Sequence, residues 1–446
     1  MKRRTFLKTS AAAGLATILS NAKSVTATPV NDRINLATFG CGDRAGLVDG
    51  PLSEREDVRF LYVVDPFTNK AANIAKMVQK PDCETKVLAN GTQVFDDKDV
   101  DAVVLVTPDH WHALHTIMAC QAGKDVYVEK PVCRTPFEGE MMIKAARKYK
   151  RVVQAGNQSR SANYCDTAKQ YILDGKLGDV DFVRVYNILE RTGPHSINQG
   201  EKCPDGLDWD YWNGPAPQLP YSSTWITNWK WFWEFGTGQL GRSAIHQIDL
   251  ARWLISAEFP KSVYSIGHFD RGEGGRTIPD TQSTVIEFEK CIMNIDQTIS
   301  KPYYLEADWE VRENDLFPYW PQDATHVELY GTKGLMKIAR LGAGWQVFTR
   351  TKNRQPQVVA QEFGRYPNKT HLYNFLDCIR SRQDPNANIE DAHRSTLLVH
   401  YANIAWRLGG IKLDIDPTTG AIQNQPGAAE LWRPEFRKPY DIPVID

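Results

Sequence analysis

The sequence lacks the cysteine patterns that mark metal centres and disulfide-rich scaffolds. Its 8 cysteines are scattered over 446 residues, and no two of them form a C-x-x-C pair. This spacing excludes a zinc framework and a dense disulfide framework. We therefore predict no metal site, and we expect most of these thiols to be small buried hydrophobic side chains.

Long apolar runs and an excess of one charge are absent as well. No segment approaches the ~20 apolar residues that a membrane-spanning helix needs, so membrane insertion is not expected. The chain has 53 Lys and Arg against 54 Asp and Glu, which gives a formal net charge of −1. Such a balance provides no field that would attract nucleic acid or an anionic membrane surface. A hydrophobic content of 42% and a charged content of 24% are typical of a globular enzyme.

Residues 1–28 have the layout of an export signal. The basic segment Lys2–Lys8 contains a twin arginine, a weakly apolar run follows at Ala11–Leu19, and small residues near Ala22 and Ala27 offer cleavage sites. This order of basic, apolar and small-residue regions predicts twin-arginine export and a periplasmic location. The alternative is a basic, alanine-rich terminus that frays.

Short apolar strands alternate with helical segments between residues 33 and 155. This alternation predicts a parallel sheet with helices on both faces. The predicted strands are Ile34–Phe39, Phe60–Val64, Ala102–Val106, Asp125–Val128 and Val152–Ala155, and two of the helices between them are His110–Ala122 and Phe137–Tyr149.

The pattern changes in residues 156–446, which we assign to a second domain. Its strand-like segments are not separated by helices, so we predict an α+β domain with a mainly antiparallel, open sheet. The segment Leu207–Phe235 is rich in Trp, Pro and Gly and is predicted to be irregular. The predicted strands are Val180–Ile188, Ser283–Phe288, Ile292–Gln297 and His326–Tyr330, and the predicted helices are Asn374–Arg380 and Asp391–Leu408.

A glycine-rich turn follows the first strand. Gly40 permits the tight turn, Gly42 lets the backbone approach a pyrophosphate, and Ala45 is small enough to fit between helix and strand. The N-terminus of the next helix then offers free N–H groups to the phosphates. These features predict a Rossmann domain whose dinucleotide-binding turn comprises Gly40, Cys41, Gly42, Asp43, Arg44 and Ala45.

Asp65 ends the second strand, where an acidic side chain binds the ribose hydroxyls of a dinucleotide. Pro66 follows it, and no Lys or Arg is adjacent to pair with a 2′-phosphate. Because the Asp65 carboxylate would repel that phosphate, we predict NAD in preference to NADP. Lys70 is the residue that could reach back and weaken this preference.

Three further motifs carry a family resemblance. The segment Thr107–His112 reads TPDHWH, the segment Glu129–Pro131 reads EKP, and Gly156–Gln158 reads GNQ. With the glycine-rich turn before them, these motifs resemble the glucose-fructose oxidoreductase/inositol dehydrogenase/rhizopine-catabolism (Gfo/Idh/MocA) family. The closest match is to its exported members that carry the TPDHWH motif. The resemblance runs from about Ile34 to His246 and continues more loosely to the C-terminus.

The resemblance implies that Lys130 lies beside the nicotinamide and the reacting carbinol. A lysine that is partly desolvated near a positive ring has a lowered pKa and can share the hydroxyl proton. The alternative is a surface lysine before a turn proline. Glu129 is expected to orient Lys130 or a ribose hydroxyl, and the further implied cofactor contacts are Thr107, Pro108, His112, Asn157 and Gln158.

His246 matches the catalytic histidine of the family, and a pKa near ~6.5 would suit an acid–base role. The family usually has an Asp four residues earlier, but this chain has Arg242. Arginine stays protonated and cannot act as a base, so Arg242 is expected to bind an anionic group of the substrate. Asp249 is expected to bind the substrate together with Arg242. The alternative for His246 is a structural histidine packed against the sheet.

The tryptophans of Leu207–Phe235 are expected to wall the mouth of the site, and Trp231 and Trp233 are expected to contact the substrate. The alternative is that these tryptophans only pack against other side chains. A zinc site at His110, His112 and His115 is not expected, because the first two lie on different sides of a helix.

Three functions remain open from the sequence. The first is an NAD-dependent oxidoreductase that acts on a sugar, glycoside or polyol, acidic or sulfated if Arg242 binds an anion. The second is an NAD-dependent glycosidase or epimerase that works by transient oxidation, and the third is a sugar-binding protein without activity. Family members often assemble through the C-terminal sheet, so a homo-oligomer is expected. Export implies a tightly bound cofactor, because the periplasm has no free NAD pool.

Replacing Asp65 tests the cofactor prediction. Asp65→Ala should weaken NAD binding and narrow its advantage over NADP, since it removes both a ribose contact and the repulsion of a 2′-phosphate. Dissociation constants for the two cofactors, measured by titration on both proteins, check this. Tighter binding of NADP than of NAD by the unaltered protein would contradict it.

Overall fold

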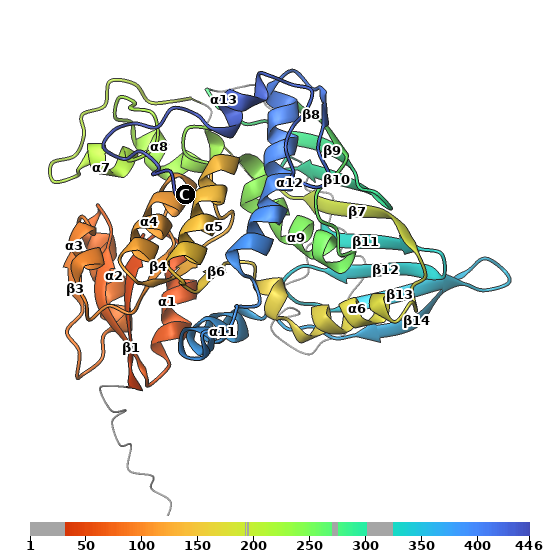
Figure 1. The fold of residues 1–446 in the computed structure, drawn as a ribbon, viewed down its shortest axis with the longest axis horizontal. Helices are drawn as coiled ribbons and strands as arrows, with labels where there is room; N and C mark the ends of the chain where they lie inside the picture. The colour runs from red at the N-terminus through yellow and green to blue at the C-terminus, as the bar shows by residue number, and fades with distance from the viewer. Residues whose placement is uncertain (1–31, 192, 194–195, 270–274, 301–323) are drawn as a thin grey trace, which may run out of the picture.

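The computed structural model describes residues 32–191, 193, 196–269, 275–300 and 324–446 (Figure 1). The predicted export signal at residues 1–28 lies outside the described residues.

The N-terminal domain is built on a parallel sheet with the strand order β3-β2-β1-β4-β5-β6. This confirms the predicted parallel sheet, and β1 and β5 have the predicted bounds. The short strand β3 was not predicted, because its side chains are exposed and form no apolar run. The strands are β1 (Ile34–Phe39), β2 (Val58–Val64), β3 (Lys86–Leu88), β4 (Ala102–Leu105), β5 (Asp125–Val128) and β6 (Val153–Ala155).

Both faces of this sheet are covered by helices. One hydrophobic cluster joins the sheet to α1, α2 and α11, and another joins its opposite face to α3, α4 and α5. A capping box between Thr135 and Glu138 fixes the start of α5. The helices are α1 (Ala45–Ser53), α2 (Thr68–Val78), α3 (Thr92–Asp96), α4 (Asp109–Gln121), α5 (Pro136–Lys148) and α11 (Asn368–Ser381).

The second sheet has nine strands in the order β14-β13-β12-β11-β7-β10-β9-β8-β15, and only β7 and β10 pair in parallel. The mainly antiparallel sheet is therefore confirmed. The strands are β7 (Val180–Ile188), β8 (Ser262–His268), β9 (Thr281–Glu287), β10 (Ile292–Thr298), β11 (Thr325–Gly331), β12 (Gly334–Ala339), β13 (Trp345–Arg350), β14 (Pro356–Glu362) and β15 (Lys412–Asp414).

Helices α6, α9 and α12 pack on one face of the nine-stranded sheet. Helix α12 crosses between the two domains (Figure 1). Its first residues, Ile389 and Ala392, belong to the N-terminal core, whereas Leu397 and Ala405 belong to the C-terminal core. The helices of this part are η2 (Gln158–Ser161), α6 (Asn163–Leu173), η4 (Leu240–Ala244, a π-helix), α9 (Ile245–Leu254), α12 (Ile389–Arg407) and α13 (Ala428–Trp432).

The segment Leu207–Phe235 lies over one end of α4 and α5 (Figure 1). It forms α7 (Trp209–Asn213), α8 (Ser223–Asn228) and η3 (Trp229–Trp231), so it is less irregular than predicted. Its aromatic side chains form a hydrophobic cluster of their own, which fixes the segment in place. None of the helices in the described residues combines the length and apolar character that a bilayer crossing requires.

Candidate active site

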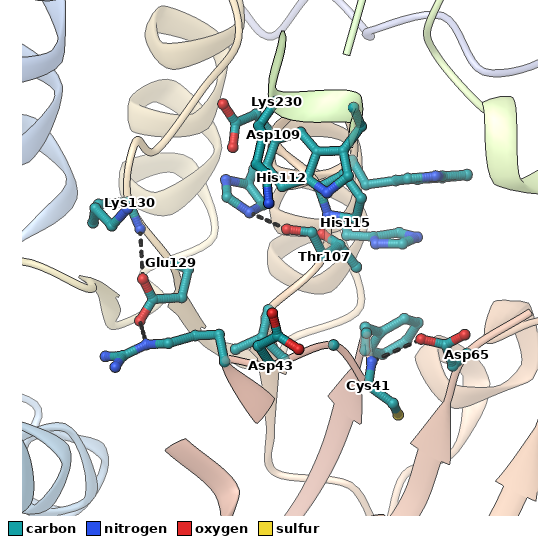
Figure 2. A pocket seen from close by; sticks show the side chains of 18 of the residues that line it. Cys41, Asp43, Asp65, Thr107, Asp109, His112, His115, Glu129, Lys130 and Lys230 are labelled. Carbon is teal, nitrogen blue, oxygen red and sulfur yellow. Dashed lines mark hydrogen bonds and ion pairs between the residues drawn. The ribbon is translucent and has the colours of Figure 1, made fainter. Parts of the chain in front are cut away.

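A cavity of about 640 Å³ opens at the carboxyl ends of β1, β2, β4 and β5. This is the edge of an open α/β sheet at which ligands bind. The loops after these strands form its floor, with Cys41, Thr107 and Glu129 among the residues drawn in Figure 2. Helices α7, α8, η3, η4 and α9 contribute to the opposite wall. Predicted cofactor and substrate residues from both domains therefore meet in one cavity.

The glycine-rich turn fits a bound dinucleotide. Gly40 has a φ of 92°, and a Cβ there would lie 2.7 Å from the Val106 carbonyl oxygen, so no other residue fits without a shift. A Cβ on Gly42 would meet nothing within 4 Å, which leaves the backbone open to a ligand. Ala45 is fully buried under the first turn of α1 and does not line the cavity, as expected of a packing residue.

Asp65 connects the ends of β1 and β2. Its carboxylate accepts hydrogen bonds from the backbone N–H groups of Cys41, at 2.7 Å, and Phe67, at 2.8 Å. Burial raises the pKa of Asp65, while these bonds and the charge of Lys70 oppose that shift. Lys70 also lines the cavity. The carboxylate thus shapes the glycine-rich turn, and it also lines the cavity.

The loop after β4 is held to the loop after β5 by His112. Its two ring nitrogens lie 2.8 Å from the Pro131 carbonyl oxygen and 3.0 Å from that of Thr107. Burial lowers the pKa of His112, and the hydrogen bonds to the two carbonyl oxygens oppose this shift. The hydroxyl of Thr107 is buried without a partner among the described residues, as expected of a group that awaits a ligand. Pro108 lies at the cavity wall between them.

Glu129 sits in a cluster of hydrogen-bond donors. The Arg44 side chain donates to it at 2.8 Å, and the Gln158 amide does so at 3.4 Å. Burial alone would raise the pKa of Glu129, but the charges of Arg44 and Lys130 lower it below its usual value. Glu129 is therefore a carboxylate that orients its neighbours, and Arg44 and Gln158 line the cavity with it.

The ammonium group of Lys130 reaches across to the second domain. Its Nζ donates a 2.7 Å hydrogen bond to the backbone carbonyl of Arg242. Burial lowers the pKa of Lys130 to about 8, against the opposing attraction of Glu129 and Asp109. A lysine with this pKa is partly deprotonated near neutrality and can accept a proton.

His246 lines the same cavity, but its titration differs from the sequence expectation. Burial and the nearby charges of Lys130 and Arg340 hold its pKa well below 6.5. The expectation of an ordinary histidine pKa was therefore wrong, because the cations come from distant segments. The lowered pKa favours the neutral imidazole, which can donate one hydrogen bond and accept one but does not readily take up a second proton.

Arg242 lies four residues before His246, in the π-helix η4, and both line the cavity. The Arg242 guanidinium has no hydrogen bond or ion pair with any described residue. Burial and repulsion from Arg191 lower its pKa to about 10. A guanidinium held in this way is available to an anionic ligand.

Two protein-family models match the chain. A description of an oxidoreductase family with an NAD-binding Rossmann fold, Gfo/Idh/MocA, matches residues 34–157, and one of its C-terminal alpha/beta domain matches residues 206–403. The chain belongs to this family. Its Rossmann domain is thus an NAD-binding domain.

Relatives of known activity support the same assignment. Levoglucosan dehydrogenase of Pseudarthrobacter phenanthrenivorans is 29% identical over 36% of this chain and 35% of its own length. The 2,7-anhydro-N-acetylneuraminate hydratase of Mediterraneibacter gnavus is 22% identical over 70% of this chain and 68% of its own length. The matched region thus spans between about a third and two thirds of these curated relatives.

Among solved structures, the fold resembles that of aldose-aldose oxidoreductase from Caulobacter crescentus complexed with glycerol. The TM-score is 0.64 at 20% identity, and the alignment covers 86% of this chain and 100% of the other. This likeness supports the two-domain fold.

Besides Ala45, four residues assigned to the site from the sequence do not line the cavity. Asp249 is bound by Arg160 at 2.7 Å and by Ser395 at 2.6 Å, so it is part of a buried ion pair. Trp231 is fully buried in the aromatic cluster of its segment, which corrects its assignment to the substrate. Trp233 faces a second cavity and donates to the Thr277 carbonyl. Asn157 is buried and does not line the cavity.

Trp212 and Trp229 line the cavity, as expected of tryptophans that wall the mouth of the site. Asp109, the first residue of α4, and Lys230, from the aromatic segment, line it as well, although the sequence did not single them out. Asp109 had a signal, since it stands at the start of a helix that follows a strand end. The described residues hold no group of His, Cys, Asp and Glu side chains able to bind a metal ion.

Replacing Lys130 tests its place in the chemistry. Lys130→Met keeps the length of the side chain and removes the ammonium, so turnover should fall by roughly 10²-fold or more. The melting temperature and NAD content should be retained, which circular dichroism and cofactor release would show. A Met variant with near-normal turnover would remove Lys130 from the mechanism.

Proposed function

We propose that this protein oxidises a CH–OH group of a sugar, glycoside or polyol with NAD. The observation that carries this proposal is the position of Lys130. Its amine stands where the cofactor loops of the N-terminal domain meet Arg242 and His246 of the second domain. A carbinol bound there would lie next to both a proton acceptor and the nicotinamide position.

The cofactor would be held by the turn Gly40–Arg44, the N-terminus of α1, Asp65 and the loops after β4 and β5. When bound, NAD supplies the hydride acceptor for the reaction. The neutral amine of Lys130 accepts the hydroxyl proton of the substrate. The neutral imidazole of His246 makes a hydrogen bond to a substrate oxygen and thereby orients it, and Glu129 fixes the backbone of Lys130.

A second candidate is a reaction with no net oxidation, such as glycoside cleavage or epimerisation through a transient ketone. The relative named as a hydratase supports it, because the family includes members not named as dehydrogenases. Purified protein incubated with a panel of glycosides separates the candidates: a dehydrogenase accumulates NADH, whereas a glycosidase releases the aglycone. A sugar-binding protein without activity does neither.

The substrate of this reaction carries an anionic group. Arg242 and Lys230 both line the cavity, and Arg191 lies close enough to repel them. None of these three side chains has a hydrogen bond or ion pair among the described residues, and the Nε of Arg191 is buried without a partner. Burial and this repulsion lower the pKa of Lys230 to about 8. A carboxylate or sulfate on the sugar would relieve the repulsion.

Two substitutions of Arg242 test the anionic substrate. Arg242→Asn should raise KM for uronic acids or sulfated glycosides by about tenfold or more, the scale of a charge-assisted hydrogen bond, with little effect on neutral analogues. Arg242→Lys keeps the charge and should recover part of the loss. Equal losses on charged and neutral substrates would instead show a structural or transition-state role.

Assembly into a homo-oligomer is part of the proposal. One face of the nine-stranded sheet packs on helices, whereas Tyr264, Ile266, Val285 and Ile292 are exposed by 40% or more. Apolar side chains at this level of exposure fit a covered sheet face.

Export by the twin-arginine route would carry the protein to the periplasm already folded around its cofactor. A dehydrogenase that released NADH there would stop after one turnover. We therefore place the protein in a closed redox cycle, in which the hydride returns to the same molecule, to a second substrate or to a dedicated acceptor.

This proposal predicts that NAD(H) co-purifies with the protein. Denaturing the purified protein and assaying the supernatant should give close to one NAD(H) per chain. Protein that is empty, needs millimolar added NAD and releases stoichiometric free NADH would contradict retention of the cofactor.

A further inference from the structure

Asp109 is a buried carboxylate in the wall of the cavity. It is only 4% exposed, it is the first residue of α4, and it lines the cavity with Lys130 and Arg242. One carboxylate oxygen accepts a 2.9 Å hydrogen bond from the hydroxyl of Thr237. The backbone of Thr237 also forms a hydrogen bond with this carboxylate.

The position of Thr237 is itself fixed. Its carbonyl accepts a 2.8 Å hydrogen bond from the Asn403 amide on α12. Its side chain lies against Gly241, where an added Cβ would approach the Thr237 hydroxyl to 2.0 Å. The stretch Thr237–Gly241 and helix α12 thus hold the group that binds Asp109. Thr237 also lines the second cavity, so it stands between the two.

The other carboxylate beside Lys130 belongs to Glu129, and the Arg44 side chain already binds it. Arg242 occupies the position that resemblance to the family assigns to an Asp, and burial together with the surrounding cations lowers the pKa of His246. Asp249, the carboxylate nearest to His246 in the sequence, already forms an ion pair with Arg160. A proton taken up by Lys130 therefore needs another group to stabilise or accept it.

We propose that Asp109 is the carboxylate partner of Lys130 and holds the substrate's hydroxyl proton during the reaction. This inference rests on the proposed function, in which Lys130 is the base. It assigns a catalytic role to a residue of α4, on a different element from the family position.

The proton and electron balance is simple. The substrate O–H bond breaks and an N–H bond forms on the Lys130 amine, while the C–H electron pair leaves as hydride to bound NAD. The Lys130 ammonium then passes its proton to the Asp109 carboxylate, so Lys130 is neutral again and Asp109 is a neutral acid. When the hydride returns to a carbonyl, the proton travels back from Asp109 through Lys130 to the new hydroxyl.

The charges around the pair favour sharing one proton. Burial raises the pKa of Asp109 to about 7, with Lys130 and the Thr237 hydroxyl opposing the shift and Glu138 adding to it. Burial lowers the pKa of Lys130 to about 8. Glu129 and Asp109 oppose this shift, and Arg44 and Arg242 add to it. Proton transfer between groups with such similar affinities costs little free energy.

Single-turnover reduction of bound NAD, measured against pH, tests the role of Asp109. The rate in the unaltered protein should rise as Lys130 loses its proton, near its lowered pKa. In Asp109→Asn the rate should fall on the order of 10²-fold. The rising limb should also move to lower pH by about one unit, because an attractive carboxylate no longer favours the ammonium. Asp109→Glu should recover part of the rate.

Asp49 provides the matched control. It is a fully buried carboxyl on α1 with a pKa raised by burial to about 8, and it does not line the cavity. Asp49→Asn should not change the pH range over which the rate of NAD reduction rises. Thr237→Val should weaken the anchor of Asp109 and lower the rate, whereas Thr237→Ser should not. If the rate of Asp109→Asn rises over the same pH range as that of the unaltered protein, the proposal is overturned.

Infrared spectroscopy of the substrate-free protein gives a readout that does not depend on turnover. A protonated-carboxyl band absent from Asp109→Asn should titrate near neutrality, and Lys130→Met should move its midpoint to higher pH, because the opposing cation is gone. If the midpoint of the band is the same in Lys130→Met as in the unaltered protein, the pairing of Asp109 with Lys130 is overturned. If the pair titrates as expected but no carbohydrate reduces bound NAD, the proposed function fails and the pairing stands.

Discussion

The hydrogen bond from Lys130 to the Arg242 carbonyl is the contact on which the site depends, because it joins the cofactor domain to the substrate domain. It can form only if the loop after β5 meets the π-helix η4. A buried network holds that meeting in place: Arg160 after β6 binds Asp249 on α9 and Asp391 on α12. Breaking one partner of such a network leaves an uncompensated buried charge, which is strongly destabilising.

Most of the cofactor half of the site was predictable from the sequence, because its signals are local. The turn at Gly40 and Gly42 follows an apolar strand, and Asp65, Thr107 and Lys130 stand at strand ends. Strand ends of a parallel sheet converge on one edge, so these residues had to meet. The nine-stranded sheet was predicted only in part, since β12–β14 carry mixed side chains without a clear period-2 pattern.

The substrate half was harder to predict, since its properties come from distant segments. Asp249 lies three residues after His246. It points to Arg160 and not into the cavity, and the position of Arg160 could not be known from the local sequence. Trp231 and Trp233 belong to a segment whose rings pack mainly on one another. The neutral state of His246 depends on Lys130 and Arg340, which no local pattern reveals. Asp109 was visible in a motif, but its surroundings were not.

Helix α12 contributes side chains to both hydrophobic cores, with Ile389 in one and Leu397 in the other. The chain is therefore not modular in the way that its two sheets suggest. A chimaera that joins this Rossmann domain to the C-terminal domain of a relative would insert a foreign helix into the N-terminal core. Recombination of cofactor and substrate preferences within the family thus requires that the cofactor domain and α12 be inherited together.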